Sequence, residues 1–267
     1  MENNNKIGVV LSGGGVRGIA HLGVLEALNE EGVYPDYLAG SSAGAIAAVM
    51  YAYGHKPADI LEIILQTNYF RFFRPSISFK ALLKMDLLQG LFAKYLPIDD
   101  FSALNIPVFI AATNIQTSQT IFFSEGPLIR RLMASSCIPG IFEPIRIPEG
   151  LFVDGGVLNN LPVEPLVSKC ETIIGVNCNN LPEIQSIAHI KGLIERTVIM
   201  SMNYNVYSRK SMCDFFIDPP GLARYGVLEI KKAKEIYDAG LASGRQFIRQ
   251  NPQLSGRKNE DFHPTKS

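Results

Sequence analysis

The sequence contains no tryptophan, and it has only four histidines and four cysteines among 267 residues. It also has no net charge, because 25 lysines and arginines balance 25 aspartates and glutamates. A balanced charge excludes bulk electrostatic attraction to nucleic acid or to an anionic membrane. No apolar run reaches the roughly 18 residues of a membrane-spanning helix. Residues 1–6 are polar and unlike a signal peptide, so we expect a cytoplasmic protein.

The cysteines exclude two further classes of protein. They are Cys137, Cys170, Cys178 and Cys213, and none stands in a C-x-x-C pair or beside a histidine at metal-ligand spacing. A disulfide scaffold is not expected in a chain of this size, so we interpret them as reduced, mostly buried thiols. We expect neither a metal nor a cofactor.

What the sequence does have is apolar material for a core, with 47% hydrophobic and 19% charged residues. A β-branched run over residues 7–11 leads into glycines, and apolar residues at helical spacing follow over 19–28. A second short strand over 37–39 is followed by a sharp turn and a helix from Ala45 onward. This alternation predicts an α/β fold with a parallel sheet.

The later elements continue the alternation. Strands are predicted at 107–113, 120–123, 151–153, 172–176 and 215–217, and helices at 127–135, 187–202 and 230–248. We predict one domain over residues 1–267, with its core motifs in 6–180 and a flexible polar tail over 251–267.

The turn over residues 40–44 matches G-x-S-x-G, with Ser42 in the central position. A serine on a tight strand-to-helix turn needs small neighbours, which Gly40, Ala43 and Gly44 supply. The helix start would place the Ala43 N–H and the positive end of a dipole near a developing oxyanion. The alternative is a plain turn in which a serine caps the helix.

A glycine loop over residues 13–18 satisfies G-x-G-x-x-G and permits two interpretations. A dinucleotide site would need an acidic residue after the second strand, but Asp36 precedes that strand. In the other interpretation the glycine amides form an oxyanion hole beside Ser42, because consecutive parallel strands end at the same edge of the sheet. Arg17 would then hold a phosphate or carboxylate of the ligand, or else form an ordinary salt bridge.

An activated serine needs a base, and the four histidines, His21, His55, His189 and His263, are poor candidates. Asp154 fits better, because it follows the predicted strand 151–153 and precedes two glycines. Burial would raise its basicity above that of an ordinary aspartate. A simple Asp-Gly turn is the alternative.

Together, the glycine loop, the turn around Ser42 and the Asp154-Gly155-Gly156 motif resemble the patatin-like phospholipase family, in particular its bacterial single-domain branch related to the neuropathy target esterases. The likeness extends to an opening block over 13–25, a serine–proline block over 134–142 and an aspartate block over 154–162. It is strong over residues 6–180 and thin afterwards.

The resemblance implies a three-layer αβα fold with a mostly parallel central sheet, and a Ser42–Asp154 pair that works without histidine. The oxyanion hole is expected from Gly13, Gly14, Gly15, Val16, Arg17 and Gly18, the elbow from Gly40, Ala43 and Gly44, and the aspartate motif includes Gly155 and Gly156. The implied activity is hydrolysis of a lipid or fatty-acyl ester, of the phospholipase A, lysophospholipase or carboxylesterase type, through an acyl-enzyme. Acyl transfer to another acceptor, and a non-catalytic nucleotide-binding or regulatory module, are the alternatives.

An aromatic segment with two arginines, Arg71 and Arg74, offers a separate hypothesis on lipid access. Tyr69, Phe70, Phe72 and Phe73 would make a transient contact with a membrane surface, and the protein would then be peripheral at the membrane. We favour the alternative, in which these aromatics cover the core or the acyl pocket. The sequence does not indicate an oligomeric state.

Overall fold

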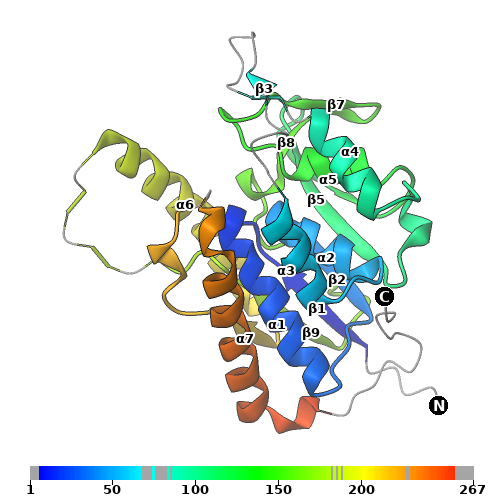
Figure 1. Ribbon diagram of the computed structural model, residues 1–267, viewed down its shortest axis with the longest axis vertical. Coiled ribbons are helices and arrows are strands. Elements are labelled where there is room, and N and C mark those ends of the chain that lie inside the picture. The colour runs from blue at the N-terminus through cyan, green and yellow to red at the C-terminus, as the bar shows by residue number, and fades with distance from the viewer. Residues whose placement is uncertain are drawn as a thin grey trace.

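A mixed sheet of eight strands forms the centre of the structure, which is a computed structural model (Figure 1). It describes residues 6–67, 74–75, 83–84, 86–181, 183–184, 186–187, 189–226 and 229–255. Hydrogen-bonded neighbours follow one another in the order β10 (Phe215–Ile217), β9 (Thr172–Val176), β1 (Ile7–Leu11), β2 (Tyr37–Ser41), β5 (Val108–Asn114), β8 (Gly150–Asp154) and β7 (Ile145–Ile147), while β6 (Gln119–Phe123) also pairs with β5. A separate short pair joins β3 (Arg74–Pro75) to β4 (Leu83–Lys84).

Parallel pairing holds the first part of the sheet together. The neighbours from β10 through β9, β1 and β2 to β5 are all parallel. β1 and β9 are buried at every position, as expected of strands with helices or packed chain on both faces. The other three strands, β6, β7 and β8, pair antiparallel, so the sheet is mixed rather than uniformly parallel.

The registers on β5 bring two strand ends together. On one edge of β5, β2 pairs in parallel up to Ser41, which lies opposite Ala111. β8 pairs antiparallel with the rest of the strand and ends with Asp154 opposite Ala112. β6 pairs with β5 over residues 110–114, which overlap both the part of β5 that pairs with β2 and the part that pairs with β8. It must therefore occupy the other edge of β5, and β2 and β8 share one edge. Their carboxyl ends therefore meet head-on at the middle of β5.

Helices cover the sheet, most of them on one face (Figure 1). They are α1 (Ile19–Glu30), α2 (Ala43–Ala52), α3 (Pro57–Gln66), α4 (Asp86–Tyr95), α5 (Ile129–Ser135), α6 (Ile190–Arg209) and α7 (Ala233–Gln250). The main core lies between the sheet and these helices. On the other face, Val10 and Ala39 pack against Leu161 and Leu166 and against Val206 of α6.

Small residues let α1 and α7 approach closely. A Cβ atom on Gly23 would lie 2.1 Å from the Tyr237 carbonyl oxygen, and one on Gly240 would lie 2.0 Å from the Ala20 carbonyl oxygen. Such distances do not occur between real atoms, so any side chain at these positions would push the two helices apart. Figure 1 shows α1 and α7 side by side in front of the sheet.

The predicted strands and helices are present, with small shifts at their ends. Five helices and strands were not predicted: α3, α4, β3, β4 and β7. Of the predicted tail over 251–267 the structure describes residues 251–255, in which Pro252–Leu254 forms a 3-10 turn with Leu254 buried. In the described part of the chain, no helix is both long and apolar enough to cross a membrane.

Candidate active site

Ser42 lies between the end of β2 and the start of α2 in a strained backbone conformation. Its φ of 53° and ψ of −122° belong to a region that non-glycine residues avoid, and Ser118 is the only other described non-glycine with positive φ. The Ser42 N–H donates to Ser135 Oγ at 2.9 Å, and that hydroxyl donates to the Ala111 carbonyl at 2.7 Å. Ser135 therefore fastens the turn to β5.

The residues around Ser42 must be small, as the G-x-S-x-G pattern predicts. A Cβ atom on Gly40 would lie 2.6 Å from the Ala45 nitrogen, and one on Gly44 would lie 2.2 Å from the Leu11 carbonyl oxygen. The turn is thus pressed against both the helix that follows and the neighbouring strand β1. This packing holds Ser42 in its strained conformation.

The side chains of Ser42 and Asp154 meet. Ser42 Oγ donates a hydrogen bond to Asp154 Oδ2 at 2.5 Å, although 112 positions separate the two residues in the chain. Both side chains are almost fully buried, Ser42 being 5% and Asp154 4% exposed. The contact follows from the head-on meeting of β2 and β8 on β5, because each residue stands at the end of its strand.

The Asp154 carboxylate is held by its own turn. The Gly156 N–H donates to Asp154 Oδ1 at 2.8 Å, and the Asp154 N–H donates to the Cys137 carbonyl at 2.8 Å. Burial raises the pKa of Asp154 to about 6, against the opposing effect of its hydrogen bonds from Ser42 and Gly156. A carboxylate with this pKa is ionised at neutral pH and is a stronger base than an ordinary aspartate.

Glycines 155 and 156 are required by close packing. A Cβ atom on Gly155 would lie 2.2 Å from the Ala111 carbonyl oxygen, and one on Gly156 would lie 2.6 Å from Asn160 Oδ1. The second glycine also faces α6, since the same Cβ atom would lie 2.7 Å from Met202 Cε.

The glycine loop lies against the Ser42 turn. A Cβ atom on Gly13 would lie 3.0 Å from Ser42 Cβ, and one on Gly18 would lie 2.5 Å from Ala43 Cβ. Residues Gly15–Gly18 form a 3-10 turn that leads into α1, and Gly15 has a positive φ of 59°. The first N–H groups of a helical turn have no partner within that turn, so this loop can offer backbone donors to an anion.

Gly13 itself does not contribute a free amide, because its N–H donates to the Asn160 carbonyl at 3.3 Å. Arg17 is buried, and its Nε donates to the Tyr225 carbonyl at 2.8 Å. This side of the guanidinium therefore contacts the chain itself rather than a ligand. Within the glycine loop, the candidate donors to a bound oxyanion are the amides from Gly14 onward.

Two asparagines that the sequence analysis did not select lie at this site. The carbonyl of Gly13 accepts hydrogen bonds from Asn160 Nδ2, at 3.3 Å, and from Asn179 Nδ2. Both residues are buried, at 0% and 1% exposure. Asn179 follows β9, whose carboxyl end lies beside that of β1, so the rule that selected Ser42 also applied to it.

The dinucleotide interpretation finds no support in the position of Asp36. Asp36 Oδ2 accepts a hydrogen bond from the Ile7 N–H at 2.7 Å. Ile7 begins β1, whereas the glycine loop follows the other end of that strand. The carboxylate is therefore at the wrong edge of the sheet to bind a ribose.

The described histidines have structural contacts away from the serine. His21 is fully buried with its Nε2 at 2.7 Å from the Ser12 carbonyl oxygen, and burial lowers its pKa to about 4. His55 Nε2 contacts the Tyr95 carbonyl oxygen at 2.8 Å, and His189 precedes α6. His263 lies outside the described residues, as do Tyr69, Phe70, Arg71, Phe72 and Phe73 of the aromatic segment.

All four cysteines are free thiols, two of them buried and two partly buried. Across the ranges that the structure describes, no group of three or more His, Cys, Asp or Glu side chains is arranged to hold a metal ion.

A serine on a strained strand-to-helix turn of an α/β sheet, beside a buried carboxylate and a glycine-rich loop, is the arrangement known as a nucleophile elbow. The chain belongs to the patatin-like phospholipase family, which matches residues 9–167. The family predicted from the three motifs is thereby confirmed.

Three relatives illustrate the range of similarity. An uncharacterized NTE family protein of Mycobacterium tuberculosis is 31% identical over 181 residues, which cover 67% of this chain and 50% of that protein. Lysophospholipase nte1 of Aspergillus fumigatus is 28% identical over 282 residues, covering 91% of this chain and 18% of the relative. Lysophospholipase NTE1 of Saccharomyces cerevisiae is 26% identical, with coverages of 91% and 16%. The chain thus spans about half the length of the mycobacterial relative and less of the fungal ones.

The fold is also similar to a solved structure. VipD from Legionella pneumophila superposes with a TM-score of 0.56 at 14% identity, covering 91% of this chain and 67% of VipD. At this identity the likeness concerns the fold alone, and it agrees with the predicted patatin-like α/β class.

Proposed function

We propose that this protein is a serine lipid acyl hydrolase that uses Ser42 as nucleophile and Asp154 as base. The observation that carries the proposal is the 2.5 Å hydrogen bond from Ser42 Oγ to a buried carboxylate whose pKa is raised to about 6. A serine hydroxyl is a weak nucleophile unless a neighbouring base takes its proton. Asp154 is in contact for that transfer, and membership of the patatin-like phospholipase family supports the choice of a lipid ester as substrate.

The first half of the reaction forms an acyl-enzyme. Ser42 Oγ attacks the ester carbonyl carbon while its proton passes to Asp154 Oδ2. The resulting tetrahedral oxyanion accepts hydrogen bonds from the amides of Gly14 and Gly15 in the glycine loop and from the Ala43 N–H at the start of α2. Breakdown expels the alcohol, which takes the proton from Asp154, and leaves the acyl group on Ser42.

The second half releases the acid. Asp154 takes a proton from a water molecule, and the hydroxide attacks the acyl carbonyl. The tetrahedral oxyanion forms again and accepts hydrogen bonds from the same amides. Ser42 Oγ then leaves as the alkoxide and takes the proton back from Asp154. Each proton that Asp154 accepts is given up in the same half-reaction, so the pair ends in its starting state.

The substrate class that we propose is a phospholipid or lysophospholipid. The names of the fungal relatives, lysophospholipases, support this choice over a small soluble ester. We also propose that Ser42 and Asp154 together are sufficient, with no metal or cofactor, since the reaction as written needs only acid–base and electrostatic steps.

Labelling with a fluorophosphonate, followed by hydrolysis assays, tests the proposal. We expect the probe to modify Ser42, and fatty acid to be released from lysophosphatidylcholine vesicles and from p-nitrophenyl esters. Ser42→Ala and Asp154→Asn should each lower kcat by about a thousandfold or more, since an interdependent pair loses nearly all its effect with either member. The value of kcat/KM should fall as the pH is lowered through about 6, because Asp154 then becomes protonated and can no longer accept the proton of Ser42.

Ser41→Ala is the matched control, because Ser41 precedes the nucleophile and its buried hydroxyl has no hydrogen-bond partner among the described residues. It should keep wild-type labelling and hydrolysis. Full activity of both Ser42→Ala and Asp154→Asn would overturn the proposal. Transfer of the acyl group to glycerol in preference to water would redirect it to acyl transfer.

A further inference from the structure

The carbonyl group of Gly13 is surrounded by donors. It accepts hydrogen bonds from the side-chain amides of Asn160 and Asn179, and Cys178 Sγ lies 3.5 Å from it as a weaker third donor. Burial raises the pKa of Cys178 to about 12, so this group keeps its proton at neutral pH. A single carbonyl in a loop rarely needs three donors to be satisfied, since it has two lone pairs.

The position of this carbonyl determines the direction of an amide. In a trans peptide the C=O of one residue and the N–H of the next point in opposite directions, and no cis bond occurs in the described chain. Fixing the Gly13 carbonyl toward the asparagines therefore turns the Gly14 N–H away from them. Gly13 lies close to both Asn160 and Ser42, because a Cβ atom on it would be 2.5 Å from Asn160 Oδ1 and 3.0 Å from Ser42 Cβ.

We propose that Asn160 and Asn179 are positioning residues that aim the Gly14 N–H at the oxyanion formed on the substrate of Ser42. The proposal rests on the acyl-hydrolase function given above and deepens it. Glycine at position 14 has broad conformational freedom, so the peptide needs an external restraint to stay in one orientation. The two asparagines supply that restraint from two different parts of the chain.

The same hydrogen bonds strengthen the donor. A carbonyl that accepts hydrogen bonds polarises its peptide group, and the N–H on the other side becomes a better donor, by roughly 10–30% for each bond. Asn160 also accepts the Gly13 N–H with its own backbone carbonyl, at 3.3 Å. Asn160 thus hydrogen-bonds both the N–H and the carbonyl of Gly13. The Gly14 N–H, which points away from the asparagines, is the first backbone donor of the loop that remains for a ligand.

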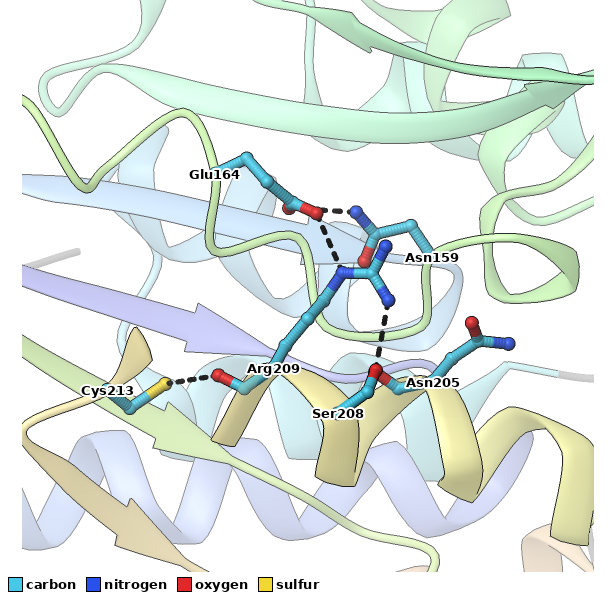
Figure 2. A network of polar contacts seen from close by, with 6 residues as sticks. All are labelled: Asn159, Glu164, Asn205, Ser208, Arg209 and Cys213. Carbon is cyan, nitrogen blue, oxygen red and sulfur yellow. Dashed lines mark hydrogen bonds and ion pairs between the residues drawn. The ribbon is translucent and has the colours of Figure 1, made fainter. Parts of the chain in front are cut away.

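Helix α6 supports both asparagines. Asn203, on its buried face, donates to the Asn179 carbonyl at 2.6 Å. Farther along the helix, Arg209 Nε donates to Glu164 at 2.7 Å, and Glu164 accepts from Asn159, the neighbour of Asn160, at 2.8 Å (Figure 2). Figure 2 shows Arg209 reaching from the helix toward Glu164 and Asn159. The loops that carry the two positioning residues are therefore both tied to one element.

The chain contains a matched control, because Asn180, beside Asn179, makes no hydrogen bond to Gly13 among the described residues and donates instead to Asp218 Oδ2 at 3.2 Å. We would compare both Asn160→Leu and Asn179→Leu with Asn180→Leu. Leucine branches at the same atom as asparagine, so the change removes the amide without opening a large cavity. Alanine variants at the same positions serve where a leucine variant does not fold.

Three measurements separate positioning from a merely structural role. They are kcat and KM for a p-nitrophenyl ester, the affinity for a trifluoromethyl ketone that forms a tetrahedral oxyanion on the serine, and the pH profile. We expect Asn160→Leu and Asn179→Leu to lower kcat about 10–100-fold, below or near the loss from deleting a donor outright. KM should stay within about threefold, ketone affinity should fall in parallel with kcat, and the acid limb near pH 6 should not move.

The failures of the two proposals give different results. If the wild-type protein is neither labelled at Ser42 nor hydrolytic, the acyl-hydrolase function is overturned and the positioning role with it. If the wild-type protein is active but both asparagine variants keep its kcat and ketone affinity, only the positioning role is overturned. Equal losses in the two variants and in Asn180→Leu, or a shifted acid limb, would also overturn it.

Discussion

The burial of Asp154 makes its carboxylate a stronger base, but it also makes the ionised form unfavourable in the folded protein. A carboxylate buried at 4% exposure is hard to ionise, and this difficulty is what raises its pKa to about 6. The same difficulty makes it a better base for Ser42. The ionised group therefore destabilises the folded protein at the pH where it would be useful for catalysis.

The free energy of unfolding of Asp154→Asn, compared with that of the wild-type protein, should show what the buried charge costs. An unfolded aspartate has a pKa of about 3.9, so between pH 4 and 6 the folded state holds a proton that the unfolded state has lost. Stability of the wild-type protein should therefore decrease as pH rises through this window and stay lowered above pH 6. The variant lacks this titration, so it should be more stable at pH 8, by on the order of 3 kcal/mol, and gain little at pH 4.

Urea denaturation of both proteins at pH 4, 6 and 8 measures the effect. Asp36→Asn serves as a control, because that carboxylate lies at the far end of β1. A wild-type protein more stable than Asp154→Asn at pH 8 would contradict the buried-charge account.

Some residues of the candidate site could be predicted from the sequence and others could not. Ser42 and Asp154 could be predicted, because each stands among glycines that close packing demands, and glycines in such patterns are visible in a sequence. Asn160 lies inside the aspartate block over 154–162 but was not singled out, and neither was Asn179, because an asparagine is common in any loop. Asn179 could have been predicted if β9 had been known to lie beside β1, because the carboxyl ends of neighbouring parallel strands lie close together.

At the scale of elements, the contact between α1 and α7 depends on glycine. Gly23 and Gly240 let backbone approach backbone, whereas around Gly90 in α4 no other described residue has an atom within 4 Å of the position a Cβ would take. Glycine inside a helix is otherwise unfavourable because of the freedom it loses on folding. The same substitution should therefore have opposite effects in the two helices.

Gly240→Ala should destabilise the protein by about 1–3 kcal/mol, because the new methyl group collides with the backbone of α1. Gly90→Ala should stabilise it by about 0.5–1 kcal/mol, since nothing obstructs the methyl group and the unfolded chain loses freedom. Thermal or urea unfolding of the two variants provides the comparison. Equal shifts of the same sign would show that helix propensity, rather than the α1–α7 contact, decides the outcome.

Helix and strand patterns predicted most elements but not the way they pair. Apolar runs indicated strands, yet the direction of β8 on β5 depends on contacts between residues far apart in the chain. The pattern around Asp154 indicated the end of a strand but not the direction of that strand. The two residues meet through an antiparallel strand that approaches from the opposite end of β5.

At the scale of the molecule, α6 is packed less tightly than the other long helix. Its outward positions include Ile190, which is 77% exposed, Ile194 at 60% and Val198 at 52%. By contrast, α7 buries a full stripe of residues from Ala233 to Ile248. Local opening of a helix requires less free energy where fewer apolar contacts are broken.

Hydrogen exchange followed by mass spectrometry should separate the two helices. Peptides from the first half of α6, around Ile190 and Val198, should exchange at least about tenfold faster than those from the middle of α7. The second half of α6 should be protected better than the first, because Asn203 and Val206 are buried there. Uniform protection along both helices would contradict this order.

The head-on meeting of β2 and β8 has a consequence for how this protein can vary. The distance from Ser42 to Asp154 is set by the registers of β2 and β8 on β5, and not by the 112 positions of chain that separate the two residues. Exposed connections in that interval, such as the turn between β5 and β6, can accept additional segments at little entropic cost. A lineage could thus enlarge or replace these exposed connections, while keeping β5, and still inherit the same reactive pair.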